Sequence, residues 1–361
     1  MISFNDTNQY NATPNPDIRG MTMTKKIKWG VLSTAKIAEE FVIPALQHKP
    51  YTEVSAIASR NVDTAKATAE KFEIPTFHGS YDALLTDPGV DAVYIPLPNH
   101  LHTEWAIKAM NAGKHVLCEK PLAMSTNDIR LMMDARDANG VKAGEAFMVN
   151  SHPQWPHLRQ LIENGVLGKL TAVQGFFSYI NKDPANIRNI SEFGGGALWD
   201  IGCYQIHCTR YLLQQEPHKI MAMANFDPIF KTDVLTSVIM RFDDITAGFT
   251  ISTQTMHSQH LTLYGEKNKL QIEIPFNAPV DRETTAIIGR ESLLNRDGEI
   301  LRFPLTNQYE AQGEAFSKAI LNDSAVPVPL EDSLKNTAAI LAAFESARTE
   351  KATSPKDFMQ V

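Results

Sequence analysis

Short apolar segments alternate with helical patterns in the first part of the chain. The apolar segments predict strands over 26–32, 53–58, 90–95 and 115–118. Between them, apolar residues recur at helical spacing and predict helices over 37–46, 63–72 and 103–112. Because the strands are almost entirely apolar, both faces of their sheet should be covered. The alternation predicts a parallel, doubly wound α/β sheet, the Rossmann nucleotide-binding fold, over residues 26–145.

The pattern changes after residue 145. A helix is expected over 155–164, with Gly165 as its C-cap. Alternating polar and apolar positions predict strands over 170–179, 220–225, 236–242, 247–254, 260–264 and 269–274. Two further helices are expected over 310–322 and 330–350, either on the second domain or packed back on the first. Residues 146–361 should therefore form an α+β domain with a large, mostly antiparallel sheet.

Residues 1–25 precede the first predicted strand and are rich in Asn, Thr and Pro. They lack a basic start followed by an apolar run, so they do not resemble a secretory signal. We expect a mobile N-terminal arm. Two alternatives stay open: Met21 or Met23 is the true start, or the arm docks on the fold or on a partner subunit.

Composition and charge narrow the function classes. A chain of 361 residues, 43% hydrophobic and 21% charged, suits two globular domains. A formal net charge of -7 argues against a nucleic acid or an anionic membrane surface as partner, and no apolar run is long enough to span a membrane. Cys118, Cys203 and Cys208 form no disulfide framework, which favours a cytoplasmic location, and they are too few and badly spaced for a zinc site. We expect no metal.

The first predicted strand is followed by the position at which a dinucleotide fold carries its glycine-rich turn. None of the three expected glycines is present. Serine and alanine are nevertheless small enough for the backbone to approach a pyrophosphate at the N-terminus of the next helix. The candidate cofactor contacts here are Ser33, Thr34, Ala35, Lys36 and Ile37.

The end of the second predicted strand bears on the choice between NADP and NAD. An Asp or Glu at this position would bind the ribose 2′-hydroxyl of NAD. This chain has Ser59 and Arg60 instead. A guanidinium beside a hydroxyl suits a 2′-phosphate, whereas the alternative interpretation is a solvated surface arginine. NADP is therefore the expected cofactor, and NAD the less favoured one.

Three side chains are suited to proton transfer at a sugar hydroxyl. Lys120 lies two residues after the strand over 115–118, and Asp200 and Tyr204 follow the triple glycine at 194–196. Four residues apart on a helix, Asp200 and Tyr204 should be neighbours on one face. An unperturbed phenol titrates near ~10, so Tyr204 needs a neighbouring cation, and Lys120 can supply it. We interpret the glycines as a close backbone approach to cofactor or substrate.

Segments 77–81, 91–102 and 112–123, the last with Glu119-Lys120-Pro121, resemble the Gfo/Idh/MocA oxidoreductases. The branch of glucose–fructose oxidoreductase, D-xylose dehydrogenase and dimeric dihydrodiol dehydrogenase is the most similar. The resemblance implies that Lys120 lies beside the nicotinamide and hydrogen-bonds the reacting hydroxyl. It implies that Asp200 orients the substrate and that Tyr204 is the acid/base.

Further site residues follow from the same resemblance. The implied cofactor contacts are Pro96, Leu97, Asn99, His102, Glu119, Lys120, Arg188 and Trp199. The implied substrate contacts are Lys120, His152, Arg188, Asp200 and Tyr204. Val149 and Asn150 replace a Tyr and an Arg that are usual in the branch, so those two substrate contacts do not carry over. His207 is expected to pack below the site.

These observations predict an NADP-dependent enzyme that transfers a hydride between the nicotinamide and a hydroxyl-bearing carbon of a cyclic sugar or diol, of the aldose dehydrogenase type. The alternatives are a sugar–sugar oxidoreductase with tightly bound NADP, an anhydrosugar or keto-sugar reductase, and a non-catalytic NADP-sensing protein. The resemblance also implies a homodimer or homotetramer, assembled through the sheet of the C-terminal domain.

Overall fold

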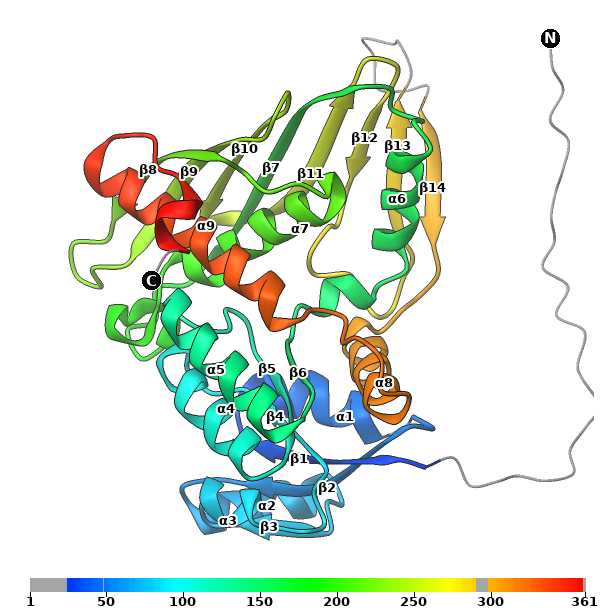
Figure 1. The fold of residues 1–361 in the computed structure, drawn as a ribbon, viewed down its shortest axis with the longest axis vertical. Coiled ribbons are helices and arrows are strands. Elements are labelled where there is room, and N and C mark those ends of the chain that lie inside the picture. Colours follow the sequence, from blue (N-terminus) through cyan, green and yellow to red (C-terminus); the bar gives the residue numbers. More distant parts are fainter. Residues whose placement is uncertain (1–24, 48, 290–297, 360–361) are drawn as a thin grey trace, which may run out of the picture.

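The computed structural model describes residues 25–47, 49–289 and 298–359, which form two β-sheets (Figure 1). The first sheet is parallel, with strand order β3-β2-β1-β4-β5-β6. Its strands are Ile27–Leu32 (β1), Thr52–Ala58 (β2), Thr76–His78 (β3), Ala92–Ile95 (β4), His115–Cys118 (β5) and Ala143–Glu145 (β6). The predicted Rossmann-type sheet is confirmed. Strands β3 and β6 were not predicted, because three residues are too few to show a periodicity.

Helices cover both faces of this sheet. They are α1 (Ile43–Gln47), α2 (Val62–Lys71), α3 (Tyr81–Leu85), α4 (His102–Asn111) and α5 (Thr126–Asn139). The prediction missed α5, whose apolar positions are sparse. Its end signals are clear, however: the Ser125 hydroxyl accepts a hydrogen bond from the N–H of Asp128, and Gly140 closes the helix with a φ of 61°.

The helix after β1 opens with a π-helical segment, Ala38–Val42, and continues as α1. A π turn contains more residues than an α turn, so the side chains leave the α-helical spacing. By α-helical spacing Phe41 would share a face with Ala38 and Val42. The latter two are buried, whereas Phe41 is 42% exposed.

The second sheet has the order β14-β13-β12-β11-β7-β10-β9-β8 and is antiparallel except where β7 pairs with β10. Its strands are Leu170–Ile180 (β7), Lys219–Phe226 (β8), Asp233–Arg241 (β9), Thr246–Ser252 (β10), Gln254–Gly265 (β11), Lys269–Ile272 (β12), Thr284–Gly289 (β13) and Glu299–Phe303 (β14). The mostly antiparallel sheet is confirmed. The sequence prediction did not include β13 and β14.

One face of the second sheet carries α6 (Gln154–Glu163) and α7 (Cys203–Leu213), as Figure 1 shows. Side chains that alternate with the core positions point away from these helices, and several are apolar. Met223 is 75% exposed and Ile239 is 54% exposed. Among the described residues, no helix is both long and apolar enough to cross a membrane.

The last two helices, α8 (Gln308–Leu321) and α9 (Leu330–Thr349), reach back to the first sheet (Figure 1). The Trp29 Nε1–H of β1 donates to Ser317 Oγ of α8 at 3.1 Å, and Trp29 packs on Phe316 with ring centroids 5.6 Å apart. At the start of α9, Glu331 pairs with Arg136 of α5. Helices α8 and α9, which follow the second sheet in the sequence, thus pack against β1 and α5 in the first half of the chain.

Candidate active site

A buried ion pair joins the two halves of the molecule. Lys120 follows β5, and Asp200 lies in a π-helical segment, Leu198–Gly202, that leads into α7. The Lys120 ammonium donates to Asp200 Oδ1 at 2.9 Å and to the main-chain oxygen of Asp200 at 2.7 Å. The two side chains are only 11% and 12% exposed. The structure therefore brings together the two residues that the sequence placed in one site.

The other carboxylate oxygen of Asp200 has two donors. Arg188 Nε donates to Oδ2 at 2.9 Å, and the hydroxyl of Tyr179 donates to the same atom at 2.6 Å. Arg188 was predicted for the site, but Tyr179, near the end of β7, was not. The alternating pattern around Tyr179 predicts only that it lies in a strand. Whether its hydroxyl reaches Asp200 depends on how the loop after β7 folds.

The charges in this cluster stabilise one another. Burial alone would raise the pKa of Asp200, but Arg188 and Lys120 outweigh it and hold that pKa well below its usual range. Burial likewise acts to lower the pKa of Lys120, and the Asp200 carboxylate more than offsets this, so the pKa is raised. Both groups are therefore ionised at neutral pH.

The ring of Tyr204 lies beneath the Lys120 ammonium. The Lys120 ammonium sits 5.0 Å from the Tyr204 ring centroid, a cation–π arrangement. The phenol hydroxyl contacts the thioether sulfur of Met148 at 3.2 Å, and Phe147 and Phe276 pack around the ring. Burial raises the pKa of Tyr204 well above its ordinary value. In the described structure the hydroxyl has no bond to Lys120 or Asp200, and the π turn at Asp200 alters the spacing on which the one-face prediction rested.

The triple-glycine loop makes contacts with both halves of the protein. Asp233 of β9 accepts a hydrogen bond from the N–H of Leu198 at 2.9 Å, so a carboxylate of the protein itself caps this helix N-terminus. Gly196 has a φ of 112°, and a Cβ there would lie 2.1 Å from Asp233 Oδ1. The loop also binds the first domain, because Asn99 Nδ2 donates to the main-chain oxygen of Gly194 at 2.9 Å. Gly196 thus admits Asp233, and the close approach of the glycines to cofactor or substrate stays a prediction.

The turn after β1 fits a dinucleotide. Ser33 has a φ of 134°, a glycine-like conformation at the position where the fold usually has glycine. In the described part of the chain no group accepts a hydrogen bond from the N–H groups of Thr34, Ala35, Lys36 and Ile37, which open the helix. These N–H groups can hold a pyrophosphate. Arg60 is exposed at the end of β2, free to reach a 2′-phosphate.

Two of the residues implied as cofactor contacts have structural roles instead. His102 is fully buried, and its Nδ1 and Nε2 lie 2.9 and 2.7 Å from the main-chain oxygens of Pro121 and Leu97. It joins the loop after β4 to the loop after β5 and presents no surface to a ligand. Trp199 is 8% exposed and packs against Phe344 of α9. Both assignments need correction, because a family resemblance does not distinguish a residue that contacts the ligand from one that packs behind the site.

Glu119 is held next to Lys120. The Tyr94 hydroxyl donates to Glu119 Oε1 at 2.7 Å, and burial raises the pKa of Glu119. Pro96 and Leu97, at the end of β4, are buried beside it in the first domain. These three residues lie at the carboxyl ends of neighbouring strands, where parallel nucleotide-binding sheets hold their ligand.

His152 is buried rather than presented to the Lys120–Asp200 cluster. Its Nδ1 accepts a hydrogen bond from the N–H of Gln154, its Nε2 has no partner in the described structure, and burial lowers its pKa to about 4. His207 is packed below the site as expected, stacked on Phe147 and bonded through Nε2 to Asn150 Oδ1 at 2.7 Å.

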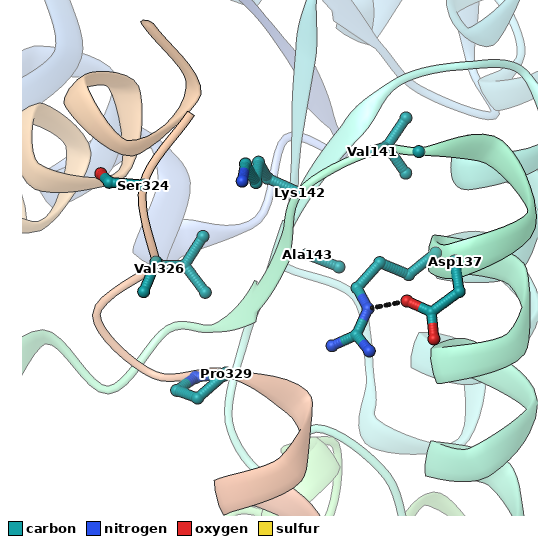
Figure 2. Close-up of a pocket in the computed structure, with 10 residues that line it drawn as sticks. Asp137, Val141, Lys142, Ala143, Ser324, Val326 and Pro329 are labelled. Atoms are coloured by element: carbon teal, nitrogen blue, oxygen red, sulfur yellow. Dashed lines mark hydrogen bonds and ion pairs between the residues drawn. The ribbon is translucent and has the colours of Figure 1, made fainter. Parts of the chain in front are cut away.

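A separate cavity of about 430 Å³ lies at the edge strand β6 (Figure 2). It is lined by Arg136, Asp137, Lys142, Val326 and Pro329, among others, and by none of the cluster residues. Its cations are already paired, Arg136 with Asp137 and Glu331, and Lys142 with Asp323. We assign no ligand to it. Among the described residues, no three His, Cys, Asp or Glu side chains gather in a way that could hold a metal ion.

Two family profiles match the chain. The profile described as "Oxidoreductase family, NAD-binding Rossmann fold" matches residues 27–147, and that of the "GFO/IDH/MocA C-terminal domain" matches residues 155–271. The matched regions contain all the cluster residues: Lys120 lies in the first, and Tyr179, Arg188, Asp200 and Tyr204 in the second.

Relatives cover nearly the whole described chain. An uncharacterized oxidoreductase of Rhizobium meliloti is 40% identical over 323 residues, 89% of this chain and 97% of its own. D-xylose 1-dehydrogenase (NADP(+)) 2 of Haloferax volcanii is 35% identical over 325 residues, with the same coverages. The solved structure of a 3-ketoreductase from Actinomadura kijaniata, in complex with NADP and TDP-benzene, has a TM-score of 0.84 and 30% identity, and it covers 89% of this chain and 98% of its own. The chain therefore belongs to the Gfo/Idh/MocA oxidoreductase family, as an NAD(P)-dependent enzyme of sugar-related substrates.

Proposed function

We propose that this enzyme uses NADP to oxidise or reduce a hydroxyl-bearing carbon of a cyclic sugar or diol, as an aldose dehydrogenase does. The single observation that carries the proposal is the Lys120 ammonium. It has three N–H donors, of which Asp200 accepts two. The third remains for the oxygen of a substrate, at the end of β5 where a nicotinamide would lie.

Lys120 would bind and polarise the reacting oxygen. When the substrate is a carbonyl compound, the remaining N–H of Lys120 donates to the carbonyl oxygen. The positive charge of the ammonium stabilises the alkoxide that develops on that oxygen. Asp200 keeps the ammonium charged and fixes its direction. Its carboxylate is occupied by Lys120, Arg188 and Tyr179, so its role is to hold Lys120 rather than a substrate hydroxyl. When bound, NADP supplies or accepts the hydride.

Tyr204 would move the proton. Its hydroxyl contacts only the Met148 sulfur, a weak acceptor, so turning towards a substrate oxygen sacrifices little. The ammonium above the ring stabilises the phenolate that forms when the proton leaves. The 3-ketoreductase of A. kijaniata gives independent support. Its solved variants replace a lysine and a tyrosine that are as far apart in its sequence as Lys120 and Tyr204 are here.

The preference for NADP over NAD rests on Arg60. It is an exposed guanidinium at the end of β2, where NAD-specific folds place an acidic residue. Two relatives agree with this choice: the H. volcanii enzyme is named for NADP(+), and the A. kijaniata reductase was solved with NADP.

A second candidate, keto-sugar reduction, is favoured by the balance of donors and acceptors. Lys120, Arg188 and Tyr204 offer N–H or O–H groups, whereas the Asp200 acceptors are already taken. Such a site suits a carbonyl oxygen better than a hydroxyl that must give up a proton. Reductases of 3,4-didehydro sugars from A. kijaniata and Streptomyces violaceoruber are 31% identical to this chain.

Rates with a substrate panel test the proposal. Aldoses, inositols and anhydrosugars would be offered with NADP, and keto sugars with NADPH. Lys120→Met and Tyr204→Phe should each abolish turnover and leave NADP affinity within about threefold. Equal loss of cofactor binding in both variants would refute the catalytic roles. A nucleotide absorbance that survives purification would indicate the sugar–sugar oxidoreductase, and NADP binding without turnover in the unmodified protein would indicate a sensor.

We further propose a homodimer or homotetramer that assembles through the outer face of the second sheet. Met221 and Met223 of β8 and Ile239 of β9 are exposed on that face, 39%, 75% and 54% respectively. Exposed apolar side chains grouped on one surface favour a protein partner. Sedimentation of the protein with Met223→Glu and Ile239→Lys should yield monomers, and an unchanged sedimentation coefficient would contradict this assignment.

A further inference from the structure

Asp200 can direct Lys120 only if its own carboxylate is fixed. Residue 200 gives Lys120 two acceptors, Oδ1 and the main-chain oxygen, and a rotation of the carboxylate would remove the first. The opposite oxygen, Oδ2, is held by Arg188 and Tyr179. The question is which of these two donors fixes the orientation.

The two donors have unequal supports. Arg188 belongs to a single 3-10 turn, Ile187–Asn189, within a loop, and its side chain is 43% exposed. Tyr179 belongs to β7, which pairs with β10 on one side and β11 on the other. An inner strand of an eight-stranded sheet moves far less than a loop. The hydroxyl lies 2.6 Å from Oδ2, a distance typical of a hydrogen bond to a charged acceptor.

We propose that Tyr179 is a positioning residue of the active site: its hydroxyl anchors the Asp200 carboxylate to the second sheet, so that Lys120 of the first domain points its remaining N–H at the substrate oxygen. The inference rests on the proposed role of Lys120. Tyr179 would act through Asp200 and need not touch the substrate. The link runs across the junction of the two domains, from β7 through Asp200 to the end of β5.

Tyr179→Phe removes the hydroxyl and keeps the ring. We expect kcat for hydride transfer to fall about tenfold, which corresponds to ~1.4 kcal/mol in the barrier. The Kd for NADP should stay within about twofold, because the nucleotide contacts are elsewhere. Tyr211→Phe is the matched control: Tyr211 is also half-buried, but it lies against Arg159 on α6, and its loss should leave kcat unchanged.

A double-mutant cycle separates positioning from a direct or merely structural role. In the Asp200→Asn background, Tyr179→Phe should change the single-turnover rate by less than about twofold, because its only target is already altered. A full tenfold loss in that background would overturn the proposal, as would a kcat of Tyr179→Phe within twofold of the unmodified enzyme.

A second measurement keeps the inference independent of the reaction. The same four proteins would be unfolded in urea without cofactor or substrate. If Tyr179 holds Asp200, the loss in urea midpoint from Tyr179→Phe should shrink by at least half in the Asp200→Asn background. Additive losses would refute the anchoring contact. If the unmodified protein shows no turnover with any sugar, the proposed function fails, and the urea cycle still decides whether Tyr179 holds Asp200.

Discussion

Replacing Lys120 with Met should reduce stability as well as activity. The substitution removes the ammonium, keeps a chain of similar length, and leaves the Asp200 carboxylate without its shortest contact at Oδ1. Because both side chains are almost fully buried, at 11% and 12% exposure, water cannot replace the lost partner.

The size of the expected destabilisation depends on the hydrogen-bond donors that Asp200 retains. Removing one member of a buried ion pair costs about 3–5 kcal/mol when the other is left alone. Asp200 keeps Arg188 and Tyr179 as donors, which offset part of that cost. We expect the free energy of unfolding of Lys120→Met to fall by about 2 kcal/mol.

The effect should not depend on pH in the neutral range. The pKa of Asp200 is depressed, so its contribution to stability is complete above the pKa that it has in the unfolded chain. That contribution is lost only as pH falls through the lower pKa of the folded state. The pKa of Lys120 is raised, so its contribution is complete below the unfolded value and is lost only in strong base. Between roughly pH 5 and 9 both remain charged.

Urea unfolding, followed by tryptophan fluorescence without cofactor at several pH values, measures this difference. Lys66→Met is the control, because Lys66 is 57% exposed and its pairing with Glu70 should contribute little. A destabilisation by Lys120→Met of less than about 0.5 kcal/mol, or one that changes between pH 5 and 9, would refute the reasoning.

Three further predictions follow from other sites. Burial raises the pKa of Glu145 to about 7, so the protein should lose up to ~3 kcal/mol as pH rises from 4.5 to 7, and Glu145→Gln should abolish that slope in urea unfolding. Arg60→Ala should weaken NADP about tenfold and NAD less than twofold in fluorescence titrations, since only NADP carries the 2′-phosphate. Gly196→Ala should cost at least ~2 kcal/mol of unfolding free energy, because its Cβ would collide with Asp233.

Each of these has a matched comparison. Gly113→Ala shares a positive φ but meets no atom within 4 Å, so it should cost only about 1 kcal/mol. Equal losses at Gly113 and Gly196 would mean that the Asp233 contact is unimportant. If Arg60→Ala leaves the ratio of NADP to NAD affinity unchanged, Arg60 does not bind the 2′-phosphate. If the free energy of unfolding changes with pH equally in the unmodified protein and in Glu145→Gln, Glu145 is not buried in its protonated form.

The sequence predicted both sheets, although four of their strands were missed, and it predicted Lys120 and Asp200, which the structure brings into contact. Apolar runs and short motifs are local signals, and Lys120 and Asp200 each belong to one. Tyr179 gave no such signal. Its hydroxyl reaches Asp200 because β7, the loop after it and the π turn at Asp200 converge, and the alternating pattern of β7 predicts the strand but not this convergence. Single-sequence reasoning finds residues in motifs and misses those that the fold brings together.

Orientation was predicted less well than location. Tyr204 was expected to neighbour Asp200 on one face of an α-helix, but Leu198–Gly202 is π-helical, and the Tyr204 hydroxyl contacts Met148 while its ring lies under Lys120. The π segment at Ala38–Val42 likewise leaves Phe41 exposed. His102 and Trp199 were likewise placed in the right region with the wrong role. Burial decides between a ligand contact and a support, and it depends on neighbours that lie far away in the chain.

The packing of α8 on Trp29 bears on how the protein is made. The ribosome makes β1 to β6 first, whereas two side chains that pack on Trp29, those of Phe316 and Ser317, are made only after the strands of the second sheet. Until then, Trp29 lacks its contacts with Phe316 and Ser317, although Ile43 and Leu46 of α1 belong to the same core cluster. The packing around Trp29 can therefore be completed only after the second sheet has been synthesised.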